Sequence, residues 1–352
     1  MKTLNYTDSD FNRLIPVQIV GTQRSGSNLL RVMLNQLSGV FAPHPAHILK
    51  TFHPIIEYYG DLKDDGNFYE LVSDICEFVR LNPVPWRNDS LDPDTVVNHC
   101  KERSLFEIYR KLYEINALSH QATYWFNKSM HNVYYIDEFT KKGFKPYIIH
   151  LVRDGRDVAL SFKNAIVGDK HIYHLAKKWK EDQEISSYFV KEFGPERAIT
   201  IKYEDLLQDP EKEIKKICVL LNINYSRNIL KYYESEDSQI TATSGEMWHN
   251  LAKPIMKNNF NKYKKGLLPD DILLFEMIAG YVLEKFDYTL ENKSNERQLT
   301  FTSEDIKRFD IINEQLKQQI LQNAAPKDLT KREPQNKLLQ YIYEKKLISI
   351  SL

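Results

Sequence analysis

Residues 17–31, VQIVGTQRSGSNLLR, carry the strongest structural signal in this 352-residue chain. The stretch begins with VQIV, a short β-branched run that predicts a buried parallel strand. Gly21 and Gly26 then bracket a polar turn, where glycine permits backbone conformations that a Cβ would obstruct. An apolar helical pattern follows directly, so the free N–H groups that begin this helix would point at an anion. The stretch therefore predicts a loop that cradles a phosphate group.

This loop differs from the loop of nucleoside triphosphatases. Gly21 and Gly26 have the spacing of G-x-x-x-x-G-K-[ST], but Ser27 and Asn28 stand where that motif needs Lys and Ser or Thr. The cation comes earlier, as Arg24, whose planar guanidinium can donate several hydrogen bonds to a phosphate. An ordinary glycine turn is the alternative interpretation. The candidate phosphate-binding residues of the loop are Arg24, Ser25, Gly26, Ser27, Asn28 and Leu29.

A second candidate anion site lies in residues 150–165, HLVRDGRDVALSFKNA. Arg153 ends a predicted strand, and Ser161 follows eight residues later within the next predicted helix. In an open α/β sheet the carboxyl ends of the strands line the ligand crevice. Arg153 and Ser161 could therefore bind a second phosphate. The alternative is a surface cluster of charges, because the RDGRD turn alternates basic and acidic residues.

Strands and helices alternate along the first 290 residues. Residues 146–152, PYIIHLV, and residues 198–203, AITIKY, predict two more buried strands, each followed by a helical pattern. This alternation indicates an α/β fold with a P-loop-like, doubly wound parallel sheet flanked by helices. Residues 55–130 read as mainly helical. We expect this insertion to lie over one edge of the sheet, where an acceptor pocket could form.

The C-terminal part of the chain has a different pattern. Residues 291–300 are polar and predict a linker, and Thr302 with Asp305 predicts a capping box at the start of a helix. We therefore divide the chain into a domain over residues 1–290 and a helical C-terminal extension over residues 291–352. We expect this extension to serve packing or self-association as a homo-oligomer rather than catalysis.

Composition narrows the classes of partner. The formal net charge is zero, which gives no reason to expect nucleic acid or an anionic membrane as a partner. No apolar run of about 18 residues predicts a membrane span, and the N-terminus lacks a secretory signal. The three cysteines are far apart and form no C-x-x-C motif, so they predict free thiols, not disulfides or a zinc site. A cytoplasmic location is the default expectation.

The two anion segments together resemble the sulfotransferase family that uses 3′-phosphoadenosine-5′-phosphosulfate (PAPS). QRSGSNLLRVML resembles its 5′-phosphosulfate loop, and VRDGRDVALSF resembles its 3′-phosphate segment. ITIKYEDLLQDP resembles its next strand and helix, which implies that Tyr203 contacts the cofactor. The resemblance covers about residues 16–290.

Two shorter segments resemble the tyrosylprotein branch of this family. KPIMKNNFNKYKKGL resembles its cofactor-covering segment, which implies that Lys253 and Lys262 bind the cofactor. WFNKSMH resembles C-N-K-D-P, which implies that Lys128 stabilises charge during transfer. The family moves a sulfuryl group to a hydroxyl or amine by in-line displacement. Arg24 and Lys128 would then neutralise developing charge, and the chemistry requires no metal.

The general base is not fixed by the resemblance. In the tyrosylprotein branch the general base is a Glu at a fixed spacing after the loop Arg. The same spacing from Arg24 leads here to Pro45, which cannot accept a proton but stands between His44 and His47 in FAPHPAHIL. The cytosolic branch uses a His in K-[ST]-H, and His131 lies one residue further from Lys128 than that motif requires. Histidine titrates near neutral pH, so any of the three could serve. We rank His44 first, His131 second and His47 third.

Two other functions are compatible with the same residues. One is a P-loop kinase or nucleotide hydrolase, which the missing GK[ST] pair disfavours. The other is a non-catalytic relative that binds a nucleotide. For the sulfotransferase, fold and cofactor motifs do not dictate the acceptor. We expect a carbohydrate, a lipid or a small metabolite rather than a protein.

Overall fold

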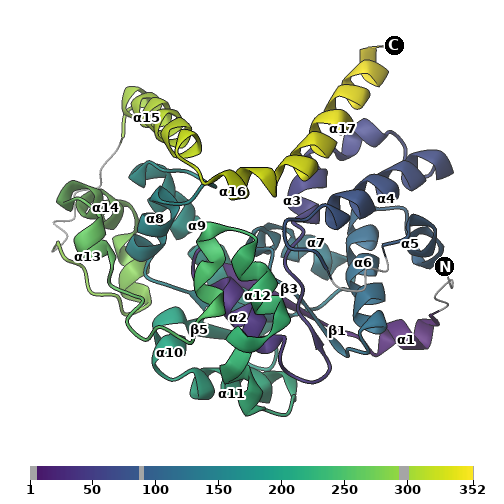
Figure 1. Cartoon of the computed structure of the whole chain (residues 1–352), viewed down its shortest axis with the longest axis horizontal. Helices are drawn as coiled ribbons and strands as arrows, with labels where there is room; N and C mark the ends of the chain where they lie inside the picture. The colour runs from purple at the N-terminus through teal and green to yellow at the C-terminus, as the bar shows by residue number, and fades with distance from the viewer. Residues whose placement is uncertain (1–5, 87–90, 293–300, 352) are drawn as a thin grey trace.

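A five-stranded parallel sheet forms the centre of the computed structural model, which describes residues 6–86, 91–292 and 301–351 (Figure 1). The strands lie in the order β2-β3-β1-β4-β5, and every neighbouring pair is parallel. This arrangement confirms the predicted α/β sheet. The strands are β1 (Ile15–Gly21), β2 (Val40–Phe41), β3 (Tyr124–Asn127), β4 (Tyr147–Val152) and β5 (Ala198–Lys202).

Helices cover both faces of the sheet because successive strand side chains point to opposite sides. Ile148 packs into one hydrophobic cluster, whereas Ile149 and Leu151 pack into another. The cluster of Ile148 includes helices α3 (Ile48–Phe52), α4 (Asp65–Arg80), α5 (Pro93–His99), α6 (Leu105–Ser119) and α7 (Ile136–Lys141). The opposite cluster includes helices α2 (Ser27–Leu34), α10 (Tyr203–Gln208) and α11 (Pro210–Leu221), with α12 (Glu236–Thr243).

The remaining elements extend these layers. A third hydrophobic cluster joins Val152, at the end of β4, to α8 (Gly155–Lys163), α9 (Ile172–Phe193), α13 (Tyr263–Gly266) and α14 (Pro269–Lys285). A short helix, α1 (Asp8–Asn12), precedes β1. The 3-10 helices are η1 (His53–Tyr59), η2 (Met130–Tyr135), η3 (Arg227–Glu234) and η4 (Glu246–Ala252).

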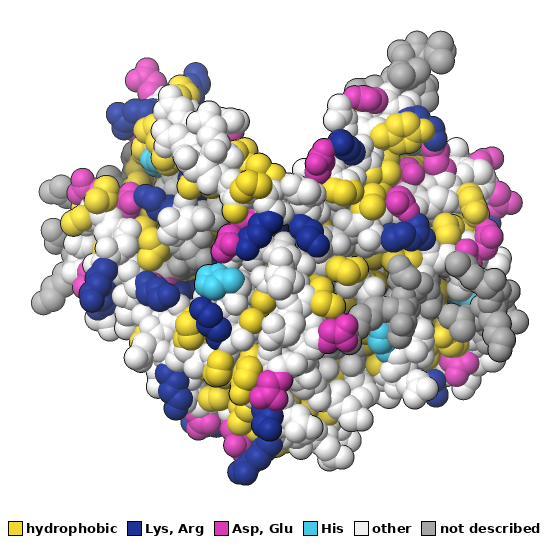
Figure 2. Space-filling model, in the orientation of Figure 1, with side chains coloured by type: hydrophobic (Ala, Val, Ile, Leu, Met, Phe, Trp, Pro, Cys, Tyr) yellow, Lys and Arg dark blue, Asp and Glu magenta, His cyan; other side chains and the backbone are white. Residues whose placement is uncertain are grey.

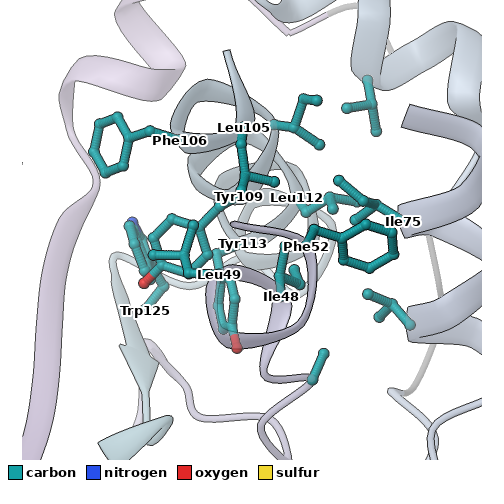
Figure 3. Packing of buried hydrophobic residues seen from close by; sticks show 14 of the residues in the cluster. Ile48, Leu49, Phe52, Ile75, Leu105, Phe106, Tyr109, Leu112, Tyr113 and Trp125 are labelled. Carbon is teal, nitrogen blue, oxygen red and sulfur yellow. The ribbon is translucent and has the colours of Figure 1, made fainter. Parts of the chain in front are cut away.

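The aromatic residues of the predicted insertion serve mainly as core. Tyr109 and Tyr113 of α6 are both 1% exposed, and Tyr113 stacks on Trp125 of β3 with ring centroids 5.2 Å apart. Figure 3 shows α6 placing these rings beside β3 and its aliphatic side chains toward α3 and α4. Burial of such rings is a large source of apolar stabilisation. Core packing therefore accounts for these two rings, whereas Phe78 near the end of α4 is one of the insertion's residues that line the cleft.

Two strands were missed by the sequence patterns. β3, with the sequence YWFN, lies inside residues 55–130 and pairs with both β1 and β2. It has four residues and β2 has two, which is too short for a hydrophobic period to be recognised. The predicted helix that contains Ser161 is α8, which begins at Gly155. Its N-cap is Asp154, whose side chain accepts a hydrogen bond from the Arg156 N–H.

The C-terminal residues form three helices, α15 (Ser303–Gln322), α16 (Pro326–Thr330) and α17 (Glu333–Ser351). The capping box of Thr302 and Asp305 is present as predicted. Figure 1 shows α15 and α17 as two projecting arms, with α16 crossing between them. Residues 293–300 of the predicted linker lie outside the described residues. The division of the chain into two parts and its self-association stay predictions.

Candidate active site

A cleft of about 940 Å³ opens at the carboxyl ends of the strands. Its lining includes residues that directly follow three strands, which are Lys128 after β3, Arg153 after β4 and Tyr203 after β5. Arg24 lies in the loop after β1, and His44 comes shortly after β2. β2 and β3 lie on one side of β1, and β4 and β5 lie on the other, so the strand order switches sides beside β1. In open α/β sheets such a switch point is where ligands bind. All five strands therefore deliver a polar side chain to one cleft.

The loop between β1 and α2 has the backbone of an anion cradle. Arg24 and Gly26 both have positive φ angles, 72° and 87°. A Cβ on Gly26 would overlap the ring of Tyr203, so this position requires glycine. Ser27 begins α2, and Ser27, Asn28 and Leu29 of its first turn line the cleft, where the N–H groups of a first turn have no partner within the helix. Because Arg24 occupies a left-handed conformation that costs about 1 kcal/mol or more, the surrounding fold must hold it there.

The two candidate anion segments meet in this cleft. The Arg153 guanidinium donates through Nη1 to the carbonyl oxygen of Arg24, at 3.0 Å. Arg24 in turn donates through Nε to Oγ of Ser161, also at 3.0 Å. Arg153 lies over the Tyr203 ring, 4.6 Å from its centroid. The charges of the RDGRD turn do form a cluster, with Arg153 3.7 Å from Asp157, but this cluster is buried and not at the surface, because Arg153 is 8% exposed and Asp157 is 1% exposed.

Several polar atoms in and beside the loop are buried without a hydrogen-bond partner among the described residues. They include Ser25 Oγ, Asn28 Oδ1 and Arg153 Nε. A buried polar atom without a partner costs free energy, about 1–3 kcal/mol for each atom. A phosphate or sulfate group in the cleft would supply acceptors for the two hydrogen-bond donors in this set, Ser25 and Arg153.

The cations of the cleft are crowded and partly removed from water. Burial lowers the pKa of Arg24 to about 10, and the charge of Arg153 acts in the same direction. Burial likewise lowers the pKa of Lys128 to about 7, with Arg31 and Arg24 adding repulsion. Arg31 itself is engaged, because it donates to Asp237 and Thr241. An anion placed among these cations would relieve their repulsion and favour their charged forms.

Two of the three candidate bases line the cleft. His44 is buried, and neither ring nitrogen has a partner among the described residues. Burial, followed by repulsion from Lys128, holds the pKa of His44 well below its usual value and lowers that of His47 to about 3. Both imidazoles are therefore neutral at pH 7, and an anion that offsets the charge of Lys128 would raise their pKa and make them better proton acceptors. His47 has φ 55°, a strained left-handed conformation at the start of α3.

Other predicted residues lie elsewhere. His131 is not among the lining residues, and its ring packs on those of Tyr134 and Tyr135. Lys253 is exposed and does not line the cleft, although its carbonyl oxygen accepts a hydrogen bond from Tyr232. Lys262 is exposed but does line the cleft. The predicted residues that the cleft brings together are Arg24, Gly26, Ser27, Asn28, Leu29, His44, His47, Lys128, Arg153, Ser161, Tyr203 and Lys262.

No sequence pattern indicated that the C-terminal extension reaches this cleft. The cleft lining nevertheless includes Asp328 of α16, Arg332, and residues of α17. α17 contributes Gln335, Asn336 and Leu339. These residues follow no strand and form no local motif, so only their position in the fold identifies them. Trp248 of η4 also lines the cleft, and it too is identified only by its position in the fold.

Comparison with known proteins identifies the family. A sequence profile of the Sulfotransferase family matches residues 16–227, which is more than half of the chain. The chain therefore belongs to the Sulfotransferase family. The matched segment contains both anion segments and ends before α12, so the C-terminal helices lie outside it.

Two relatives have similar sequences, and the name of one agrees with this assignment. The chain is 23% identical over 284 residues to a Caenorhabditis briggsae protein named "Putative protein-tyrosine sulfotransferase", covering 78% of this chain and 90% of the relative. It is 21% identical over 282 residues to an uncharacterized protein of Aquifex aeolicus (strain VF5), covering 77% of this chain but only 34% of that protein.

Two solved structures share the fold. One is a sulfotransferase domain from the Synechococcus PCC 7002 olefin synthase, with a TM-score of 0.53, 23% identity, and coverage of 79% of this chain and 96% of that one. The other is a sulfotransferase domain from the curacin biosynthetic pathway, with a TM-score of 0.54, 21% identity, and coverage of 79% and 99%. Both confirm the P-loop-like architecture.

The side chains that could bind a metal are dispersed. Among the described residues, no group of three or more His, Cys, Asp or Glu side chains is arranged to hold a metal ion. Cys76, Cys100 and Cys218 are free thiols, as the sequence predicted. No helix in the described part of the chain is both long and apolar enough to cross a bilayer.

Proposed function

We propose that this chain transfers a sulfuryl group from PAPS to a hydroxyl or amine of an acceptor. The observation that carries the proposal is the convergence of the β1–α2 loop, Arg153 with Ser161, and Lys128 on one cleft that also holds neutral histidines. Membership of the Sulfotransferase family supports the reaction class. The cleft volume of about 940 Å³ leaves room for a nucleotide donor and an acceptor together.

The donor's two charged ends would occupy different parts of this cleft. The N–H groups at the start of α2 and the side chains of the loop would bind the 5′-phosphosulfate. Arg153 and Ser161 would bind the 3′-phosphate, with Tyr203 beside them. The hydrogen bonds that link Arg24 to Arg153 and to Ser161 support a shared arrangement, because movement of one group would shift the others.

The chemistry is an in-line displacement at sulfur. The acceptor oxygen forms a new O–S bond while the bond between sulfur and the bridging phosphate oxygen breaks. The electron pair of that bond leaves with 3′-phosphoadenosine-5′-phosphate (PAP), and the acceptor proton passes to the base. Arg24 and Lys128 would offset the charge that grows on the bridging and equatorial oxygens, an effect worth about 2–4 kcal/mol for each group.

We assign the base to His44, with His47 as the next candidate. Both line the cleft, and both are held neutral by burial and by nearby cations. His44 has two ring nitrogens free of protein partners among the described residues, so one can take the proton without breaking a hydrogen bond. His131 ranks below them because it does not line the cleft.

Calorimetry with the desulfated donor tests the proposal. We expect PAP to bind, and Arg153→Gln to weaken PAP binding about 10- to 100-fold, as for loss of a charge-assisted contact. Binding of 5′-AMP, which lacks the 3′-phosphate, should change much less. Arg227→Gln, at an exposed position outside the cleft lining, is the matched control. Equal losses for PAP and 5′-AMP would contradict the role of Arg153, and absence of PAP binding would contradict the function.

A turnover assay separates the enzyme from a non-catalytic relative. PAPS and a broad panel of hydroxyl and amine acceptors should yield PAP together with a sulfated product. Binding of PAP without transfer to any acceptor would favour a nucleotide-binding relative that has lost its chemistry.

A further inference from the structure

Residues 326–339 of the C-terminal extension are docked over the cleft by specific contacts. Oδ1 of Asp328 accepts a hydrogen bond from the backbone N–H of Glu246 at 3.0 Å, and Asp328 is 5% exposed. The Gln335 side chain donates to the carbonyl oxygen of Phe78 at 2.9 Å. Ile342, one helical turn beyond Leu339, is 1% exposed and belongs to the hydrophobic cluster that contains Ile148. These residues are therefore held in place as part of the cleft wall.

Arg332 is the cation that this segment brings to the cleft. Its guanidinium lies 5.6 Å from the centre of the Trp248 ring, in a cation–π arrangement. Within residues 6–86, 91–292 and 301–345, whose side chains the structure describes, Arg332 forms no ion pair and no side-chain hydrogen bond. Packing on a ring face leaves the planar edge of a guanidinium, with its N–H donors, free to bind a carboxylate or phosphate.

Arg332 also lies within electrostatic reach of both candidate bases. Its positive charge is one of the causes that lower the pKa of His44 and of His47. Asp328 is the acidic group that acts on Arg332. Its Oδ1 is already engaged with Glu246, so it offsets the charge of Arg332 only in part. The wall beside the histidines therefore carries a positive charge that the donor-binding loop does not use.

The cations that line the cleft come from two parts of the chain. Arg24, Lys128 and Arg153 follow the strands and serve the proposed donor site. Arg332 comes from the C-terminal extension, beyond the segment that the family profile matches, and its charge acts on His44 and His47 but is not among the charges that act on Arg24 and Lys128. Figure 2 shows Lys and Arg side chains at the base of the notch between the arms α15 and α17. Because Arg332 is beside the histidines and outside the proposed donor site, it would contact the acceptor.

We propose that the C-terminal extension forms the acceptor subsite, and that Arg332 binds an anionic group, a carboxylate or a phosphate, on a hydroxyl-bearing acceptor. This proposal rests on the proposed function, because it takes the histidine side of the cleft as the acceptor side. It makes Arg332 a specificity-determining residue. The extension would then act in substrate recognition, beyond the packing or self-association expected from its sequence.

Binding of matched small molecules to PAP-saturated protein tests this inference. The probes are anionic compounds and neutral counterparts of similar shape: 4-hydroxyphenylacetate with 4-hydroxyphenylacetamide, glucose 6-phosphate with glucose, and galacturonate with galactose. We expect the anionic member of at least one pair to bind about tenfold or more tightly than its neutral partner, as for a charge-assisted contact. No preference in any pair would overturn the proposal.

Variants at position 332 decide whether this residue supplies the preference. Arg332→Gln should abolish the preference for the anion, and Arg332→Lys, which keeps the charge but not the planar fork, should retain part of it. Lys331→Gln, at the exposed neighbouring position, should leave it unchanged. A preference that survives Arg332→Gln would overturn the assignment.

Two further measurements separate the possible failures. Thermal unfolding of Arg332→Gln reports whether loss of the contact with Trp248 has released the extension. If the extension has been released, Arg332→Lys, which keeps a cation beside Trp248, is the variant to compare. PAP binding measured on the same variants should stay within about twofold of the original, because the charge of Arg332 is not among those that act on Arg24 and Lys128. Failure of the original protein to bind PAP would count against the proposed function, whereas normal PAP binding without anion preference would count against this inference alone.

Discussion

The two sides of the cleft are built in different ways. One side consists of residues at or shortly after the ends of parallel strands, including Arg24, Lys128, Arg153 and Tyr203. The other side consists of segments that are far apart in the chain, from η4, the end of α4 and the C-terminal extension. The first, which we call the strand side, has short sequence motifs. The second, which we call the helix side, has no motif that the sequence revealed.

This difference follows from the geometry of the sheet. A parallel strand fixes where its next residue lies, so a few residues after a strand suffice to form a binding loop. A wall made of helix ends depends on how whole helices pack. The strand side can therefore be shared across a family, while the helix side can vary with the acceptor. Substitutions on each side test whether chemistry and donor binding belong to the first and acceptor binding to the second.

The largest effect is expected for the proposed base, His44. His44→Gln should lower kcat about 10²- to 10⁴-fold, because the acceptor would lose the group that takes its proton. PAP affinity should change little, since His44 does not belong to the donor loop. Steady-state kinetics and PAP calorimetry measure the two effects. His47→Gln is the matched comparison, and a larger loss there would reverse the assignment.

Loss of the buried lysine should come next. Lys128→Met should lower kcat about 10²- to 10³-fold, as for removal of one group that stabilises transition-state charge. PAP calorimetry on the same variant provides the reference, because the lysine variant should still bind PAP. A variant with unchanged kcat would remove Lys128 from the proposed chemistry.

The same lysine predicts a pH dependence of donor binding. With a pKa of about 7 in the free protein, Lys128 is mostly neutral at pH 8. A bound anion raises that pKa, so donor binding at pH 8 should take up about one proton, and affinity should fall as pH rises above 7. Calorimetry in buffers of different ionisation enthalpy measures the uptake. Lys128→Met should abolish it, and an unchanged uptake would assign the proton to another group.

A backbone substitution tests the strand side without removing a charge. Gly26→Ala should weaken PAP binding about tenfold or more, because the methyl group would overlap Tyr203 and the position requires a positive φ. Gly143→Ala is the matched control, since Gly143 also has a positive φ but no heavy atom within 4 Å of the added Cβ. Similar losses of PAP affinity in both would mean that the contact with Tyr203 is unimportant.

The smallest effect on catalysis is expected on the helix side. Ile342→Ala should loosen the docked extension and lower kcat/KM for the acceptor about two- to tenfold, while PAP affinity stays the same. Removal of such a buried side chain commonly costs about 2–5 kcal/mol of local or global stability. Ile311→Ala, at a 61% exposed position in α15, is the control for the same substitution. A loss of PAP affinity in Ile342→Ala would show that the two sides are not separable.

Local sequence patterns were sufficient to predict three of the five strands, β1, β4 and β5, and the binding loops that follow β1 and β4. VQIV before a glycine turn, and YIIHLV before RDGRD, identify buried strands that end in binding loops, because burial on both faces requires continuous apolar runs. The short strand β3 has too few residues for such a pattern, and Lys128 was found only through a resemblance. Binding residues that lie close to a strand end in the sequence could be predicted without knowing which distant residues they contact.

The distant residues that share the cleft could be recognised only from the folded chain. Folding brings Arg332, more than 280 positions after His44 in the chain, to the wall beside the histidines, and it places His131 outside the lining. Such contacts depend on helix packing among many apolar side chains, which local periodicity does not specify. Strand ends are positioned by hydrogen bonds to their neighbours, whereas the extension is positioned by its packing against the completed core.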